Sequence, residues 1–150
     1  MSSPLRYEEI ESALRTVFLS AFSDRLDATR LQIGDIDTAF EGIRADETAT
    51  DACVLDFGGG TSKPRRTIGN IHWAWVISGV YMIRYHDDIE GALREVVSRI
   101  PQTLQTNPRL NGTADLAYVT ELGDPIIGKL NDITFYFLPF FVEVLDRSIQ

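Results

Sequence analysis

The residues with the most chemical promise lie in one stretch, DFGGGTSKPRR, residues 56–66. It holds three glycines and three cationic side chains: Gly58, Gly59, Gly60, Lys63, Arg65 and Arg66. A loop that cradles phosphate with its backbone N–H groups needs the spacing GxxxxGK[ST] between a strand and a helix. Here Lys63 is followed by Pro64 and then by a predicted strand, so both the spacing and the next element are wrong for a phosphate site.

The letters Asp56-Phe57-Gly58 also match the DFG of protein kinases, but the glycine-rich hairpin and the H-R-D sequence of kinases are missing. We therefore interpret residues 58–66 as a flexible hairpin loop whose tip carries the three cations. Two interpretations of the charges stay open. They keep a loop soluble, or the loop docks on an acidic patch of a neighbouring subunit or partner.

The remaining polar residues predict no catalytic, cofactor or metal site. His72 and His86 are 14 residues apart and lack the HxxxH or HExxH spacing of a metal site. Asp87 and Asp88 are adjacent at the expected start of a helix, where a cap and a favourable charge on the helix dipole explain them. No serine or cysteine has an identifiable base, so we expect a protein that is not an enzyme and binds no cofactor or metal ion.

The composition predicts one acidic domain spanning residues 1–150, because 44% hydrophobic residues in a chain of this length suffice for one core. The chain has 14 Lys and Arg against 22 Asp and Glu, a formal net charge of -8, which disfavours binding to nucleic-acid phosphates as the main activity. Cys53 is the only cysteine, which excludes an intrachain disulfide and fits a reducing compartment. The start of the chain does not have the pattern of a signal peptide, and the apolar runs are shorter than the roughly 20 residues of a membrane helix. Neither secretion nor membrane insertion is expected.

Two helices are expected from the spacing of apolar residues. Between Tyr7 and Phe22 these residues recur at steps of three and four, as on one face of a helix. A second helix follows Asp87, which forms a possible capping box with Glu90, and its apolar stripe reaches Ile100.

Four main strands are expected, at residues 52–57, 70–85, 114–121 and 133–146, and a further short strand is suggested at 31–33. In the strand over 70–85 both alternating sets are apolar, as in a strand covered on both faces. Gly79 is interpreted as a bulge or bend in it, and Pro139 as a bulge or an edge position. The order of elements predicts an α+β fold, an antiparallel or mixed sheet of about four main strands with two principal helices packed on it.

Aromatic side chains crowd two of these strands and fall on both of their faces: Trp73, Trp75, Phe135, Tyr136, Phe137, Phe140 and Phe141. One face should pack under the helices. The other face is covered either by neighbouring subunits or within a self-contained core.

A series of segments follows in a recognisable order: the N-terminal helix, ACVLDF, the glycine loop, HWAWVISGVYMIRY, DDIEGALREVVSRI, LNGTADLAYV and ITFYFLPFFVEVLDR. In pattern and order they resemble the tail terminator, or tail completion, proteins of long-tailed bacteriophages, the group of the minor tail protein U. The resemblance covers most of the chain and assigns no counterpart to residues 24–51.

The resemblance implies a structural virion protein at the head-proximal end of the tail. It would form a hexameric ring that stops polymerisation of the tail tube and provides the head–tail joining surface. The implied partners are further copies of itself, the tail tube protein and the head–tail connector or neck proteins. DNA would pass through the lumen without sequence-specific binding, and assembly would take place in the host cytoplasm without contact to a membrane. By the same analogy, the loop over residues 58–66 would contact an adjacent subunit or the tube.

Two alternatives stay open beside this expectation. A neck or head-completion connector protein shares the setting but differs in which face binds which neighbour. A small-ligand binding module would instead use the aromatic strands as a pocket.

Overall fold

The computed structural model describes residues 3–26, 31–34, 51–56, 62–67, 70–130 and 133–146. Of residues 3–7, 62–67, 70–73, 130 and 146 it describes the backbone only. The helices are α1 (Ser3–Ala21) and α3 (Ile89–Thr106). The strands are β1 (Leu31–Ile33), β2 (Asp51–Asp56), β3 (Ser62–Thr67), β4 (Asn70–Arg84), β5 (Leu116–Leu122), β6 (Ile126–Leu130) and β7 (Ile133–Asp146).

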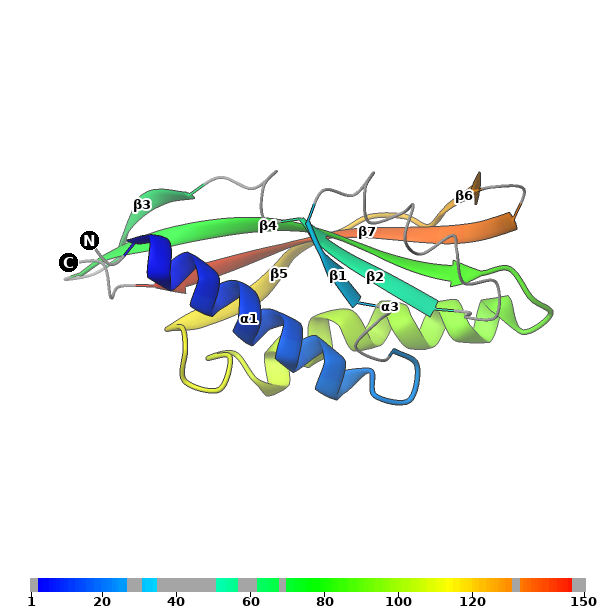
Figure 1. Ribbon diagram of the computed structural model, residues 1–150, viewed down its shortest axis with the longest axis horizontal. Coiled ribbons are helices and arrows are strands. Elements are labelled where there is room, and N and C mark those ends of the chain that lie inside the picture. The colour runs from blue at the N-terminus through cyan, green and yellow to red at the C-terminus, as the bar shows by residue number, and fades with distance from the viewer. Residues whose placement is uncertain are drawn as a thin grey trace.

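The strands form one seven-stranded sheet in the order β1-β2-β4-β7-β5, with β3 paired to β4 and β6 paired to β7. β1 and β2 run parallel, and the other pairs are antiparallel. Both helices lie on the same side of the sheet (Figure 1). The predicted α+β class is therefore confirmed, although the sheet has seven strands rather than about four.

The two long strands β4 and β7 form the centre of the sheet and pair from Trp73–Asp146 to Arg84–Phe135. Each is flanked by two shorter strands in succession, β2 and β3 along β4, and β5 and β6 along β7. β3 pairs with the first part of β4, and β6 pairs with the first part of β7. Because β4 and β7 are antiparallel, β3 and β6 lie at opposite ends of the sheet (Figure 1).

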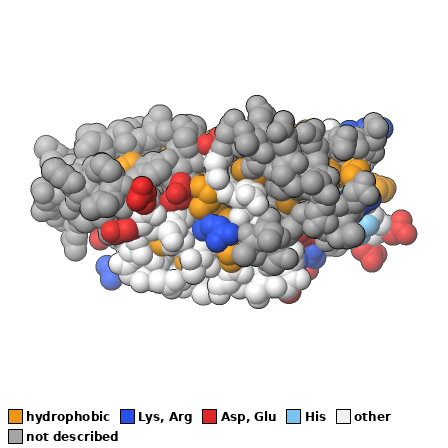
Figure 2. Space-filling view, in the orientation of Figure 1, with side chains coloured by type: hydrophobic (Ala, Val, Ile, Leu, Met, Phe, Trp, Pro, Cys, Tyr) orange, Lys and Arg blue, Asp and Glu red, His pale blue; other side chains and the backbone are white. Residues whose placement is uncertain are grey.

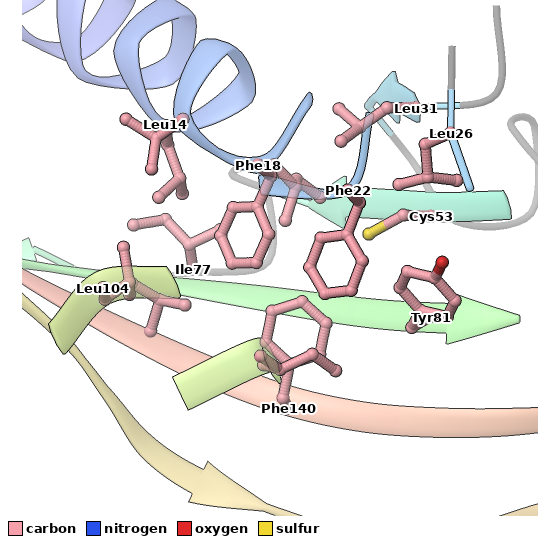
Figure 3. Close-up of a cluster of buried hydrophobic side chains, with 14 of the residues drawn as sticks. Leu14, Phe18, Phe22, Leu26, Leu31, Cys53, Ile77, Tyr81, Leu104 and Phe140 are labelled. Carbon is pink, nitrogen blue, oxygen red and sulfur yellow. The ribbon is translucent and has the colours of Figure 1, made fainter. Parts of the chain in front are cut away.

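The main core fills the space between the sheet and the helices (Figure 3). The ring of Phe18 on α1 lies 5.8 Å from that of Phe140 on β7, and the ring of Phe22 lies 5.2 Å from that of Tyr81 on β4. Each of these four side chains is at most 1% exposed. α3 adds a buried apolar stripe: Ile89, Ala92, Val96, Ile100 and Leu104. One aromatic face of the sheet thus packs under the helices, as predicted.

Gly79 marks a close approach of two strands rather than a bulge. β4 pairs without a register shift with β2 from Asp51–Ile83 to Asp56–Ser78, and also with β7, so the predicted bulge is wrong. Gly79 instead faces Phe140 across the two strands. A Cβ built on Gly79 would lie 2.3 Å from an atom of that ring. The missing side chain lets the Phe140 ring lie over the backbone of β4.

Pro139 lies in a central strand that pairs with β4 without the predicted bulge, but no described strand pairs with its outer side, so the predicted edge position holds locally. It pairs with Val80 of β4, while its carbonyl accepts a hydrogen bond from the N–H of Gly123 on the opposite side, at 2.8 Å. In an antiparallel strand the N–H and C=O of one residue point the same way. The nitrogen of Pro139 therefore faces the break between β5 and β6, where its missing hydrogen costs no ladder bond.

The second face of the sheet carries a smaller buried cluster: Ala52, Val54, Met82 and Phe135. Tyr81 and Ile83 face the main core while Met82 faces this second cluster, so β4 is buried on both faces, as its sequence predicts. Glu143 lies on the same second face, is 3% exposed, and accepts a hydrogen bond from the hydroxyl of Tyr118.

The start of α3 differs from the predicted capping box. The N-cap residue is Asp88, and its side chain makes no capping hydrogen bond, so the expected box between Asp87 and Glu90 is wrong. The backbone N–H of Asp88 instead donates to Nδ1 of His86 at 3.2 Å, and the N–H of Ile89 donates to the carbonyl of His86 at 3.1 Å. His86 thus caps the start of α3 by accepting hydrogen bonds from the N–H groups of Asp88 and Ile89.

Candidate functional site

The cations of the predicted loop lie in a strand. Gly58, Gly59 and Gly60 fall outside the residues that the structure describes. Lys63, Arg65 and Arg66 belong to β3 and pair in register with Ala74, His72 and Ile71 of β4. The expectation that these three residues sit at the tip of a hairpin loop is therefore wrong, because the tip of this hairpin lies between Thr67 and Asn70.

The glycine-rich stretch belongs to the connection between β2 and β3, which both pair with β4. The last pair of β2 is Asp56–Ser78 and the first pair of β3 is Ser62–Trp75. Five residues, 57–61, therefore connect these two strands where β4 has only two, 76 and 77. An interaction of these glycines with a neighbour stays a prediction.

The apolar side chains that the described chain leaves exposed gather at two places: Tyr85, Ile126 and Ile127 at the end of the sheet that carries β6, and Leu116 and Phe141 on the second face near β5. At the first place, the ring of Tyr85 stacks on that of Tyr136, which pairs with Ile127. Figure 2 shows hydrophobic side chains at this end of the molecule, next to a histidine and several acidic side chains. Apolar side chains exposed together at one end of a sheet are typical of surfaces that another molecule covers.

β6 is the strand whose apolar residues are least covered. Ile126 pairs with Phe137 on the second face, and Ile127 pairs with Tyr136 on the helix side. These two isoleucines are 58% and 59% exposed. Neighbouring strand residues point to opposite faces, so β6 is apolar on both faces, as in a strand with cover on both sides. The described residues supply that cover on neither face.

The sequence predicts no strand between 121 and 133, where β6 lies, because Gly123, Asp124, Pro125 and Gly128 are typical of a loop. The signal that could have found it is the pair Ile126-Ile127 directly after a proline, in a segment otherwise rich in turn residues. β3 was missed for a related reason, since SKPRRT has a proline and three charges, a composition that strands tolerate mainly at edges.

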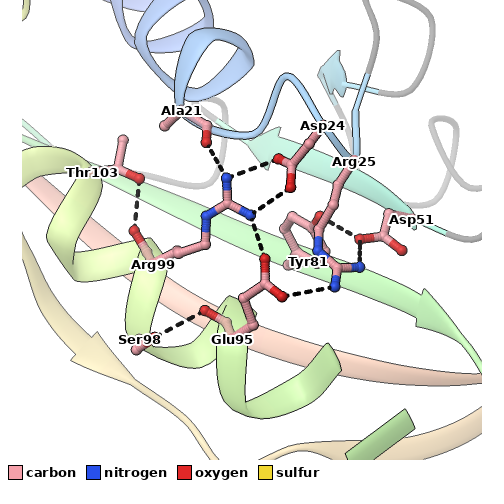
Figure 4. A network of polar contacts seen from close by, with 9 residues as sticks. All are labelled: Ala21, Asp24, Arg25, Asp51, Tyr81, Glu95, Ser98, Arg99 and Thr103. Carbon is pink, nitrogen blue, oxygen red and sulfur yellow. Dashed lines mark hydrogen bonds and ion pairs between the residues drawn. The ribbon is translucent and has the colours of Figure 1, made fainter. Parts of the chain in front are cut away.

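A network of ion pairs joins the end of α1 to α3 and the sheet (Figure 4). Arg99 bonds Asp24 and Glu95, each at 2.8 Å, and Arg25 bonds Glu95 and Asp51, each at 3.2 Å. The guanidinium of Arg99 also donates to the carbonyl of Ala21 at 2.6 Å, which satisfies an acceptor at the C-terminal end of α1. The network has a structural role, because it fixes the two helices on the sheet.

The environment shifts several pKa values in this region. A hydrogen bond from Arg99 lowers the pKa of Asp24, and one from Arg25 lowers the pKa of Glu95. Burial raises the pKa of Tyr81, whose hydroxyl donates to Asp51 at 2.6 Å, and the charge of Asp51 adds to this rise. Burial raises the pKa of Cys53 to about 12, so its thiol stays protonated and is a poor nucleophile near neutral pH.

A groove of about 350 Å³ lies between the two helices. Its lining includes Thr16 and Ser20 of α1, Gln102 and Thr106 of α3, and Asn107 and Asn111 beyond α3. The hydroxyls of Thr16 and Thr106 donate to backbone carbonyls of their own helices, and the amide of Asn107 donates to the side chain of Asn111. Much of the hydrogen-bonding capacity of the groove is thus used within the chain.

The histidines and acidic residues form no metal cluster in the part of the chain that the structure describes. His86 is half-buried and caps α3 as described above, while the side chain of His72 is not described. Asp87 and Asp88 are exposed at the start of that helix. Among the described helices, none is long and apolar enough to cross a membrane.

Comparison with known proteins identifies no relative. No family model matches the sequence, and no curated protein matches it. The function is therefore inferred from the surfaces of the molecule and from the order of its segments.

Proposed function

We propose that this chain is a structural assembly protein that forms a ring at the head-proximal end of a phage tail, where it terminates the tail tube and provides the head–tail joining interface. Copies of the same chain, the tail tube protein and the connector or neck proteins are its partners in this proposal. DNA passes through the lumen of the ring without sequence-specific binding.

The observation that carries the proposal is the exposed strand β6. A strand with Ile126 and Ile127 more than half exposed on opposite faces fits a protein that completes its sheet against a neighbour. Natural sheets blunt exposed edges with charges, bulges or cover, and β6 has a single charged residue, Lys129, beside its two exposed isoleucines. The proposal of a ring at a tube end further rests on the resemblance in the order of the segments.

The charge of the chain supports the same proposal. The net charge is -8, and a negatively charged lumen repels DNA that has to pass without sticking. The densest basic run, Lys63, Arg65 and Arg66 on β3, stands out against this background and suits a contact with an acidic neighbour.

A neck or head-completion connector protein is the second candidate. The exposed strand β6 and the basic strand β3 favour it as well, since it would also assemble with copies of itself or with a neighbouring ring. The ligand-binding alternative expected a pocket along the aromatic strands. The rings of Phe140 and Tyr81 are buried in the core, and the groove described above is lined by the helices.

The experiment that tests the proposal adds the purified protein to tail tubes of a long-tailed phage and images them by negative stain. The terminator proposal expects a cap at one end of each tube, and tubes that stop growing once they are capped. Particles that bind connectors but ignore tube ends would favour the neck alternative. A protein that binds neither would contradict both.

A further inference from the structure

Four strands of the sheet, β1, β3, β5 and β6, pair with only one other strand within the described residues, and β1 and β5 each have one further hydrogen bond on the outer side. β1 is covered at Leu31, whose carbonyl accepts a hydrogen bond from Nε of Arg15 at 3.3 Å. β5 is covered at Ala117, whose N–H donates to the carbonyl of Pro108 at 2.6 Å. For β3 and β6, the described residues supply pairing on one side only, by β4 and β7. Among the described residues, the two strands without any such outer hydrogen bond are β3 and β6, at opposite ends of the sheet.

These two strands differ in character in a complementary way. β3 has the sequence SKPRRT, with three cations and no acid, and its proline suits an edge strand. β6 has the sequence IIGKL, and the chain just before it carries the exposed acids Glu121 and Asp124. One end is therefore basic, and the other is apolar with one exposed cation, Lys129, and an acidic flank.

The net charge narrows the choice of partner for β6. Two copies with a net charge of -8 each repel one another unless their contact brings opposite charges together. A contact of β6 with β6 would bring Glu121 and Asp124 of the two copies to the same interface. A contact of β6 with β3 brings this acidic flank to Lys63, Arg65 and Arg66 and avoids that repulsion.

We propose that the β6 end of one copy of this chain docks on the β3 end of a second copy. The contact buries Ile126 and Ile127 and places Glu121 and Asp124 against the cations of β3. Because the two ends are different surfaces of one molecule, the contact is head-to-tail, and such a contact generates a ring where the rotation between neighbours closes. The inference rests on the proposed function in one respect only, the self-association of the chain.

The test uses two double variants in the full chain. The first, Ile126→Asp with Ile127→Asp, removes the β6 surface, and the second, Arg65→Glu with Arg66→Glu, removes the β3 surface. By light scattering after size exclusion, each alone should be a monomer at concentrations where the wild type is oligomeric, with association weakened on the order of 100-fold. Mixed together they should form a heterodimer that grows no further, because only one intact pair of surfaces remains.

Matched controls separate the surfaces from general charge effects. Gly91→Asp with Gln105→Asp adds the same two negative charges at exposed positions of α3, and Arg94→Glu with Arg109→Glu reverses two exposed cations elsewhere. Both control variants should assemble like the wild type. A milder variant, Ile126→Thr with Ile127→Thr, keeps β-branched residues in the strand in case aspartates disturb the hairpin. It should weaken assembly as well, while circular dichroism stays unchanged.

Each outcome decides the inference. Dimers formed by the β3 variant alone would show β6-to-β6 contact and overturn it, as would double variants that assemble like the wild type. A wild type that stays monomeric both alone and with tail tubes would also overturn it. Assembly that depends on both surfaces but never caps a tube would support the contact and contradict the proposed function. Capping of tubes that persists in both double variants would support the proposed function and contradict the contact.

Discussion

Large apolar side chains of β7 and of β6, the strand that pairs with its first part, lie in opposite environments. Phe140 lies over Gly79 and against Phe18 of α1 and is 1% exposed. Ile126 and Ile127, on the strand that pairs with the start of β7, are more than half exposed. The helices of the chain close the first surface, and the described chain closes neither face of the second. The core therefore serves the stability of one subunit, and β6 serves contact between subunits.

The largest effect on the free energy of unfolding is expected from a substitution in the core. Phe140→Ala should lower the free energy of unfolding by about 3–5 kcal/mol, because it removes a ring buried between α1 and β4. The matched control is its neighbour Phe141, on the other face of β7 and 37% exposed. Phe141→Ala should cost less than about 1 kcal/mol. Urea denaturation of both variants measures the difference, and equal losses would contradict the assigned faces.

The next effect concerns the ion pairs that hold the helices on the sheet. Asp51→Ala should lower the free energy of unfolding by about 3 kcal/mol, because the buried hydroxyl of Tyr81 loses this acceptor and Arg25 loses an ion pair. Asp51→Asn keeps an acceptor oxygen and should cost less. Chemical denaturation ranks the two variants, and a larger loss for the asparagine variant would refute this explanation.

Gly79→Ala should lower the free energy of unfolding by about 2 kcal/mol, since its new methyl group would overlap the ring of Phe140. Combined with Phe140→Leu, the same glycine substitution should cost much less, because the smaller side chain leaves room for the methyl. A double-mutant cycle measures this coupling. Additive losses would mean that the glycine is needed for a reason other than the ring.

A smaller effect is expected from acid. The lowered pKa values of Asp24 and Glu95 mean that both carboxylates stabilise the folded chain at neutral pH and lose this contribution as the pH falls below about 4. Both side chains are largely exposed, so the loss should be modest. In Arg99→Gln the fall of the urea midpoint from pH 7 to pH 3 should be shallower than in the wild type. An unchanged slope would argue against the role of Arg99.

The smallest effect on stability is expected from substitutions in β6. Ile126→Thr with Ile127→Thr should change the free energy of unfolding of the monomer by no more than about 0.5 kcal/mol, since both side chains are already half in solvent. The variant should nevertheless weaken assembly. Thermal denaturation of dilute protein checks the first expectation. A strongly destabilised monomer would show that these residues belong to the fold of the subunit.

Much of the fold follows from local patterns in the sequence. The strand predicted at 133–146 has these bounds in the structure, and the alternation in 70–85 correctly predicted burial of both faces of β4. Gly79 and Pro139 could not be read in this way, because their roles depend on Phe140 across the strand pair and on the break between β5 and β6.

The candidate site was harder to predict than the fold. The basic run of β3 was recognised as unusual but placed at a loop tip, because a proline and three charges outweigh strand signals in a local reading. β6 was hidden among turn residues. The ion pairs join positions as far apart in the sequence as Arg25 and Glu95, which are separated by 70 residues, and no local pattern predicts such a pairing.

The most direct test of the central claim is the mass of the wild-type protein, measured by light scattering after size exclusion across a concentration series. We expect a closed oligomer of several subunits, seen as rings by negative stain, that dissociates on dilution and at high salt. A particle with the 16.8 kDa mass of one chain at every concentration, with or without tail tubes, would contradict the account.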